Sequence, residues 1–444
     1  YKSTDYEAAF MEGLAEQRAE IDAIATQNSS PTFDNTIGAL ERSGKKLAKV
    51  TGVFFNLNET DADDVMRETE KKLSPILTEH SAYMTMNEAL FARIKALYDT
   101  GIIDKDRYII CNGFKRPQYV ENIASLINSG FTNTIPVIDN KEEIDLFTDV
   151  IEKSCKVGIR IASEEEPKFD FYTSRLGIRY NDIIDFYKQK IKNNKKFKLK
   201  MLHFFINTGI KDTAYYWNEL RKCISVYCEL KKVCPDLDSL NIGGGFPIKN
   251  SLNFEYEYEY LAEEIVAQIK HTCNENGVEE PNIFTEFGSF TVGESGAVLY
   301  SIVNQKQQND RELWNMIDSS FITTLPDTWA INQRYILLAI NNWDKEYQRV
   351  HLGGLTCDSE DYYNGESHTN AIFLPKLTNN EPQYIGFFHT GAYQESLGGF
   401  GGIQHCLMPA PKHIIIDRDT NGEYYTRLFA KEQSYRSMMR ILGY

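Results

Sequence analysis

The sequence lacks an excess of positive charge, and it lacks long apolar runs. It holds 48 lysine and arginine residues against 63 aspartate and glutamate residues, so its formal net charge is −15 at pH 7. Such a chain has no surplus basic face to neutralise phosphates, so nucleic acids and anionic membranes are disfavoured as partners. No apolar run reaches the length of a membrane-spanning helix, and we expect no membrane partner.

Cysteine and histidine also lack the spacings of common metal and redox sites. None of the eight cysteines forms a Cys-x-x-Cys pair, and there is no His-Glu-x-x-His sequence. A chain of 444 residues can bury its own core without disulfides, so we expect reduced thiols, no metal site and a cytoplasmic location. No signal peptide is recognisable, and a first residue of Tyr1 rather than Met indicates a truncated amino end.

Residues 1–99 carry apolar side chains at helical spacing. Tyr6, Phe10 and Leu14 begin the first stripe, and Asn87 is suited to cap the last helix. These stripes predict an antiparallel helical bundle, and no residue in them points to chemistry.

From residue 100, short apolar runs alternate with helical stretches. Strands are predicted within 107–114, 134–139, 156–162, 198–206, 240–245 and 282–288, with helices at 180–193, 213–232 and 256–275 between them. This βαβ alternation predicts a parallel sheet or barrel of six strands, where a closed barrel has eight. After about residue 290 the long helices stop. We expect an α/β plus all-β chain with domains at 1–99, 100–290 and 291–444.

Several polar or glycine-rich segments fall where the predicted strands end. His203, Phe205 and Thr208 end one strand, the sequence "NIGGGFP" ends the next, and Glu286 ends the last. In β/α barrels the carboxyl ends of strands hold the functional residues. Glycine backbones can bind phosphate, although a triple glycine is also typical of a tight structural turn. Glu286 is likewise open to interpretation as a paired carboxylate of the barrel rim.

Five motifs occur in one order: "ICNGFK" (110–115), "NIGGGFP" (241–247), "TEFGSFTVGESGAVL" (285–299), "TCDSED" (356–361) and "GAYQE" (391–395). On these motifs, residues from about 100 to 444 resemble the fold-III pyridoxal-phosphate decarboxylases of ornithine, arginine and diaminopimelate. The likeness is greatest to a short arginine-decarboxylase-like branch. It implies an incomplete alanine-racemase-like β/α barrel followed by a C-terminal β domain. The implied activity is a carboxy-lyase of polyamine biosynthesis that uses pyridoxal 5′-phosphate and a small basic amino acid.

The same resemblance implies a cofactor pocket. Gly243, Gly244 and Gly245 would cradle the cofactor phosphate, and the hydroxyl of Tyr393 would add to it. Glu286 would face the pyridine nitrogen and keep it protonated, so that the ring accepts the electrons released when CO₂ leaves.

Two further residues would bind the cofactor, Phe205 against its ring face, and two others would act on the substrate. Phe205 takes the place of the family's ring-stacking histidine, and Thr208 follows it on the same segment, which leaves His203 as a satisfied core histidine. Cys357 would return a proton to the carbanion, and Asp358 would hold the distal cation of the substrate. In the family these last two serve the partner subunit, which implies a head-to-tail homodimer. Taken alone, a cysteine is more often a buried apolar residue.

The sequence departs from the family pattern in three places. Ser289 stands where an arginine often contacts the phosphate. The family's cofactor forms a Schiff base with a lysine on the first barrel strand, and no such strand precedes residue 100; Lys115 occupies another position and is no substitute.

The third departure is the amino-terminal segment. Residues 1–99 resemble the helical region of M3 oligopeptidases near the dipeptidyl carboxypeptidases, through "FDNTIGALERSGKKLAKVTGVFF" (33–55) and "NEALFARIKALYD" (87–99). We therefore expect a chimera with a junction near 99–101, and a decarboxylase by descent whose activity is impaired or absent. The alternatives are an M3-type peptidase fragment and a non-catalytic cofactor-binding or scaffold protein.

Overall fold

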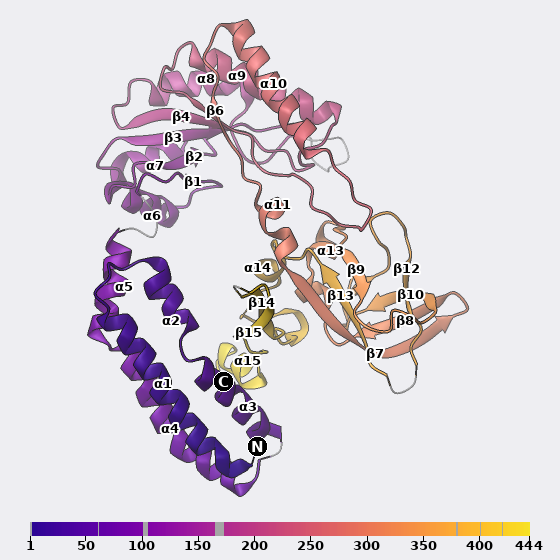
Figure 1. Ribbon diagram of the computed structural model, residues 1–444. Coiled ribbons are helices and arrows are strands. Elements are labelled where there is room, and N and C mark those ends of the chain that lie inside the picture. The colour runs from indigo at the N-terminus through magenta and orange to yellow at the C-terminus, as the bar shows by residue number, and fades with distance from the viewer. Residues whose placement is uncertain are drawn as a thin grey trace. The chain divides into compact units, whose positions relative to one another are not determined.

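The computed structural model describes residues 2–60, 62–100, 105–164, 173–378, 381–399, 401–419 and 421–444 (Figure 1). It divides into two units, one of residues 1–109 with 126–134 and one of residues 110–125 with 135–444. The predicted junction near 99–101 runs into residues 101–104, which lie outside the described residues. Within the described part of the chain, no helix has the length and apolar content needed to span a bilayer.

The first unit is helical, as the stripes predicted. Its elements are η1 (Ser3–Asp5), α1 (Tyr6–Thr26), η2 (Asp34–Gly38), α2 (Ala39–Arg42), α3 (Lys45–Thr60), α4 (Asp64–Thr85) and α5 (Glu88–Thr100). Figure 1 shows α1 and α4 side by side, and the two are in contact. Helix α1 approaches α3 closely because Gly13 has no side chain: a Cβ there would lie 2.9 Å from Leu47 Cα. Asn87 accepts a hydrogen bond from Leu90 N at 2.9 Å, which confirms the predicted cap.

The second unit begins with a six-stranded sheet. Its strands lie in chain order: β1 (Ile109–Cys111), β2 (Thr134–Ile138), β3 (Cys155–Arg160), β4 (Phe197–His203), β5 (Ser239–Asn241) and β6 (Asn282–Phe284). The pairings from β2 to β6 are parallel. The connecting helices are α6 (Pro117–Asn128), α7 (Glu143–Val150), α8 (Ile183–Phe186) with η4 (Tyr187–Ile191), α9 (Ala214–Lys231) and α10 (Tyr258–Asn276). The six predicted strands are confirmed, and all of β2 is buried, as expected of a parallel strand covered on both faces.

A largely β region follows α11 (Gly288–Val292). Its mixed sheet has the order β11-β10-β8-β7-β13-β9, with β12 paired to β10. The strands are β7 (Ala297–Asn309), β8 (Glu312–Ile317), β9 (Ile336–Ala339), β10 (Tyr347–Gly353), β11 (Tyr362–Tyr363), β12 (Ile372–Pro375) and β13 (Gln383–Phe388). A second sheet joins β14 (His413–Arg418) to β15 (Tyr424–Ala430), and short helices include α14 (Gln394–Gly398), η6 (His405–Leu407) and α15 (Tyr435–Ile441). The predicted α/β part followed by β structure is confirmed, while the domain boundaries stay predictions.

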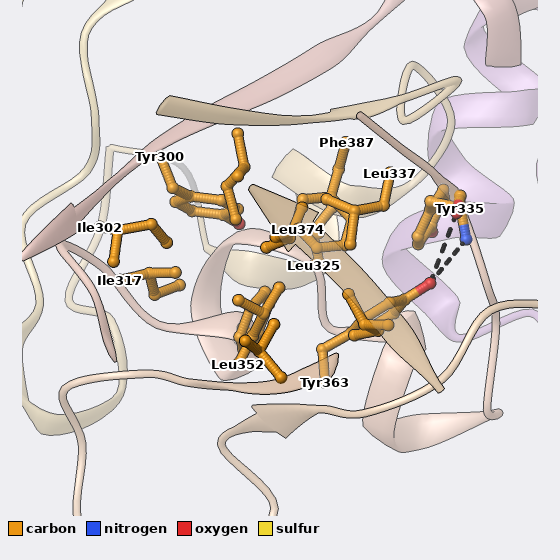
Figure 2. Close-up of a cluster of buried hydrophobic side chains, with 14 residues drawn as sticks. Tyr300, Ile302, Ile317, Leu325, Tyr335, Leu337, Leu352, Tyr363, Leu374 and Phe387 are labelled. Carbon is orange, nitrogen blue, oxygen red and sulfur yellow. Dashed lines mark hydrogen bonds between the residues drawn. The ribbon is translucent and has the colours of Figure 1, made fainter. Parts of the chain in front are cut away.

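Figure 2 shows the core that holds this mixed sheet together. The rings of Tyr363 and Phe387 meet edge to face with centroids 4.9 Å apart, and Tyr300 packs on Phe387 at 5.7 Å. The hydroxyl of Tyr363 is buried but accepts a hydrogen bond from Tyr335 N at 3.1 Å. The Tyr363 hydroxyl is therefore buried with a hydrogen-bond partner, which offsets most of the free-energy cost of burying a polar group.

Candidate functional site

The ends of strands β3 to β6 lie in register. Arg160 pairs with His203, His203 with Asn241, and Asn241 with Phe284. Parallel strands in register place the residues that follow them at one edge of the sheet, which is where a β/α fold positions its functional side chains. Glu286 stands two residues beyond β6 and lies at this edge.

Two amides from other strands hold the Glu286 carboxylate. Oε1 accepts hydrogen bonds from Asn241 Nδ2 at 2.7 Å and from Asn112 Nδ2 at 2.8 Å. The other oxygen, Oε2, lies 4.0 Å from His203 Nε2, and among the described residues it accepts no hydrogen bond. The side chain of Glu286 is 33% exposed, so the carboxylate is partly accessible to an external donor.

His203 is buried beside this carboxylate without a hydrogen bond. Its exposure is 2%, and neither ring nitrogen has a partner among the described residues. Burial lowers the pKa of His203 to about 4, and the negative charge of Glu286 only partly opposes this shift. The expectation of a core histidine is confirmed in its burial but is wrong in calling the ring satisfied. Asn112 Oδ1 is buried without a partner too, so polar atoms accumulate here unpaired.

The triple glycine lets three strand-end segments meet. A Cβ on Gly243 would lie 2.8 Å from Phe204 O, and one on Gly244 would lie 2.4 Å from Glu286 O. Gly243 and Gly245 also have positive φ angles of 69° and 110°, which favour glycine. The N–H of Gly243 donates to Asn241 Oδ1 at 2.9 Å. The N–H groups of Gly244 and Gly245 have no acceptor among the described residues, so two donors rather than three remain for a phosphate.

Phe205 and Thr208 follow β4 beside the glycine loop. The ring of Phe205 would lie 3.0 Å from a Cβ on Gly243, and the guanidinium of Arg160 lies 6.0 Å from its centroid. Thr208 is buried at 8% exposure. The structure thus brings together Phe205, the glycines and Glu286; that these residues bind a cofactor stays a prediction.

Lys115 follows strand β1, and its side chain is buried among other protein groups. Its side chain is 0% exposed, Nζ lies 3.3 Å from Glu143 Oε2, and Nζ donates to Gly113 O at 2.6 Å and to Val137 O. Burial lowers the pKa of the Lys115 ammonium, and Glu143 opposes that shift. These contacts give Lys115 a structural role, and they agree with the expectation that it is no substitute for the family's lysine.

Cys357, Asp358 and Tyr393 lie in the β region. Cys357 is exposed, with Sγ 4.0 Å from Cys406 Sγ, and Asp358 Oδ2 lies 3.5 Å from His405 Nε2. Tyr393 is 62% exposed and has a φ of 67° at the start of α14. Among the described residues, no hydrogen bond, ion pair or ring contact joins these three to Glu286 or to the glycines.

Comparisons with known proteins bear directly on this site. Residues 96–293 match the family model described as the pyridoxal binding domain of the pyridoxal-dependent decarboxylases. Over these residues the chain is similar to the pyridoxal-dependent decarboxylases. Its cofactor is accordingly pyridoxal 5′-phosphate, and its inherited reaction class is that of a carboxy-lyase.

Relatives and solved structures agree with this similarity. The chain is 23% identical over 462 residues to the biosynthetic arginine decarboxylase of Prochlorococcus marinus (strain MIT 9215), covering 77% of this chain and 70% of that protein. The crystal structure of the biosynthetic arginine decarboxylase of Campylobacter jejuni matches with a TM-score of 0.64 at 19% identity, over 79% of this chain and 72% of that one. Diaminopimelate decarboxylase of Helicobacter pylori, complexed with L-lysine, matches with a TM-score of 0.59 at 16% identity, over 79% and 82%. At such identities the structural matches show the fold.

The residues of this decarboxylase homologue fit two ends of its cofactor. The free N–H groups of Gly244 and Gly245 suit a phosphate, and Glu286 Oε2 suits a protonated ring nitrogen. The unpaired nitrogens of His203 lie beside the same carboxylate, as expected where a polar ligand completes the contacts. Lys115 is not available to the cofactor's aldehyde, because its ammonium is held by Glu143 and two backbone carbonyls.

Sequence reasoning missed the two asparagines that position Glu286. Asn112 directly follows β1, and Asn241 ends β5 within the glycine motif. A polar residue that ends an otherwise apolar strand was the available signal. It was not recognised because single asparagines are also common in turns.

Proposed function

We propose that this chain retains the pyridoxal-phosphate site of a basic-amino-acid decarboxylase, arginine being the substrate, and that its own turnover is impaired or absent. The observation that carries the proposal is the Glu286 carboxylate, held on one oxygen by two amides and open on the other. The names of the matching arginine decarboxylases support arginine as the substrate.

The chain's own residues account for binding and orientation. Gly244 and Gly245 would offer N–H groups to the phosphate, and Phe205 would pack against the ring. Glu286 would hold a proton at the ring nitrogen, because a nearby carboxylate favours the charged form of the ring. Bound pyridoxal phosphate supplies an electron sink for the electron pair left when a carboxylate departs as CO₂.

The impairment follows from what precedes the sheet. The described residues before β1 form helices α1 to α5, and among them there is no barrel strand with a lysine. Lys115 is tied to Glu143 and to two carbonyls, and freeing it would leave a buried carboxylate unpaired. The cofactor would therefore be held without a covalent anchor, and exchange of the substrate amine onto it would be slow.

The substrate end of the site requires a second copy of the chain. Cys357 would return a proton to the substrate carbanion, Asp358 would bind its distal cation, and Tyr393 would add a phosphate contact. Since no contact joins these residues to Glu286 among the described residues, a head-to-tail homodimer accounts for their separation. We place this dimer in the cytoplasm and in polyamine biosynthesis.

The helical unit is proposed to have another origin. The likeness of residues 1–99 to M3 oligopeptidases implies a junction near 99–101 between two partial genes. A genomic read across codons 90–110 tests whether this junction is real and whether a complete copy with its lysine exists. A continuous reading frame in independent isolates contradicts an assembly artefact. A zinc-dependent peptidase assay tests the alternative that the chain is a fragment of an M3 peptidase.

Three measurements on the purified chain test the proposed function. Titration with pyridoxal phosphate is expected to show saturable binding at one site per chain. Borohydride reduction followed by peptide mapping is expected to place no lysine adduct in the β1 to β6 region. Release of CO₂ from carboxyl-labelled arginine is expected to be near background with added cofactor. Brisk cofactor-dependent release refutes the impairment, and absence of saturable binding refutes the retained site.

A further inference from the structure

Two cysteines from distant parts of the sequence lie together on the surface of the β region. Cys357 Sγ lies 4.0 Å from Cys406 Sγ, although 49 positions separate the residues. Both are exposed, whereas Cys111, Cys155, Cys223, Cys228, Cys234 and Cys273 are buried. A dissolved thiol reagent therefore reaches this pair while the fold protects the other six.

The backbone around Cys406 fixes its position. Cys406 and Leu407 have φ angles of 53° and 55°, a conformation that residues other than glycine rarely adopt. Leu407 N donates to Gln404 O at 3.0 Å, and Gln404 is buried at 7% exposure. Such strained residues persist where the surrounding structure holds them, and they gather at functional sites. Cys406 is therefore directed at Cys357 by a held turn rather than by a freely moving loop.

An acid–base group stands beside the two sulfurs. His405 Nε2 lies 3.3 Å from Cys406 Sγ and 3.5 Å from Asp358 Oδ2. The imidazole can take the proton of the Cys406 thiol, and the carboxylate of Asp358 stabilises the imidazolium that results. Desolvation, together with the adjacent Cys357, raises the pKa of the Cys406 thiol, so this thiol needs such a base before it can react.

We propose that Cys357 and Cys406 form a dithiol site that exchanges with small disulfides such as oxidised glutathione, closing a reversible intramolecular disulfide. The Cys357 thiolate attacks one sulfur of oxidised glutathione, forms a mixed disulfide and releases one glutathione. Cys406 then gives its proton to His405, and its sulfur attacks Cys357 Sγ and releases the second glutathione. Two protein thiols lose two electrons, and one oxidised glutathione becomes two thiols that carry the two protons.

The geometry allows this closure. The two sulfurs must approach from 4.0 Å to bonding distance, about 2 Å, which rotation of two exposed side chains can supply. If Cys357 serves as the proton donor, the disulfide removes that donor reversibly. This consequence rests on the proposed function, whereas formation of the bond does not.

The test uses the folded full-length chain in glutathione buffers of graded oxidation. Free thiols are then blocked with N-ethylmaleimide, and tryptic peptides are mapped by mass spectrometry. We expect one peptide pair linked through Cys357 and Cys406, reversed by dithiothreitol, with the buried cysteines unblocked until denaturant is added. Cys406→Ser is expected to leave a lasting glutathione adduct on Cys357, and the matched variant Cys273→Ser is expected to form the link as the parent chain does.

Two outcomes overturn the proposal. One is a folded chain in which both cysteines carry separate glutathione adducts and no link appears. The other is a link that forms only in denaturant, or equally among the buried cysteines. The variant His405→Gln tests whether the imidazole acts as a base or the two sulfurs are merely close. It is expected to slow the attack of Cys406 on the mixed disulfide about tenfold or more, while glutathione adduct formation on Cys357 stays unchanged. These readouts need no decarboxylase activity, so they stand apart from the proposed function.

Discussion

Replacing Glu286 with glutamine perturbs the retained cofactor site with the least structural change. Asn112 and Asn241 both donate to Oε1, so the glutamine oxygen is expected to keep that place and to direct its amide nitrogen at the ring. A hydrogen bond that involves a charged group contributes about 1.5–3 kcal/mol. Because the Glu286 side chain is 33% exposed, we take the lower part of that range, which corresponds to binding weakened about 10- to 30-fold.

The assay follows equilibrium binding of 4′-deoxypyridoxine 5′-phosphate by fluorescence. This analogue keeps the phosphate and the ring nitrogen but has no aldehyde, so it cannot attach to surface lysines. The matched control is Glu294→Gln, which neutralises an exposed carboxylate in the segment that joins α11 to β7. Equal affinities for the two variants would refute the assignment of Glu286 to the ring nitrogen.

Three further predictions concern stability, each measured by chemical denaturation. Gly244→Ala, whose Cβ would lie 2.4 Å from Glu286 O, is expected to cost about 1–3 kcal/mol of unfolding free energy; an unchanged value contradicts the close approach. Glu143→Ala, which leaves buried Lys115 unpaired, is expected to cost about 3–5 kcal/mol, while Glu143→Gln should cost less. His203 has a folded pKa of about 4, below its ordinary 6.5, so the unfolded state binds the proton more tightly. Stability should therefore fall by up to about 3 kcal/mol as pH drops from 6.5 to 4, and a pH dependence unaltered in His203→Gln would contradict this.

The strands could be predicted because each leaves a local signal. Short apolar runs bounded by glycine or polar residues, with helical spacing between them, placed all six strands of the parallel sheet. The glycine motif after β5 and the Glu286 carboxylate after β6 could be predicted from the same pattern, because glycine or polar residues mark the end of each apolar run. The structure adds the reason for the glycines, since neighbouring strand ends occupy the space where Cβ atoms would stand.

The contacts around Glu286 could not be predicted in the same way. His203 and Asn241 end two different strands and Asn112 follows a third, and only the fold of the sheet brings them to one carboxylate. The sequence places a polar residue at a strand end but does not show which partner it meets. Cys357 and Cys406 show the same limit, since folding of distant segments creates their proximity.

A crystal structure of the full chain soaked with pyridoxal 5′-phosphate would show whether the glycines and Glu286 hold the cofactor. We expect the phosphate on the N–H groups of Gly244 and Gly245, the ring nitrogen within hydrogen-bond distance of Glu286 Oε2, and no covalent bond from Lys115. A cofactor bound elsewhere, or a Lys115 drawn out of its contact with Glu143 to bond it, would refute the retained cofactor site.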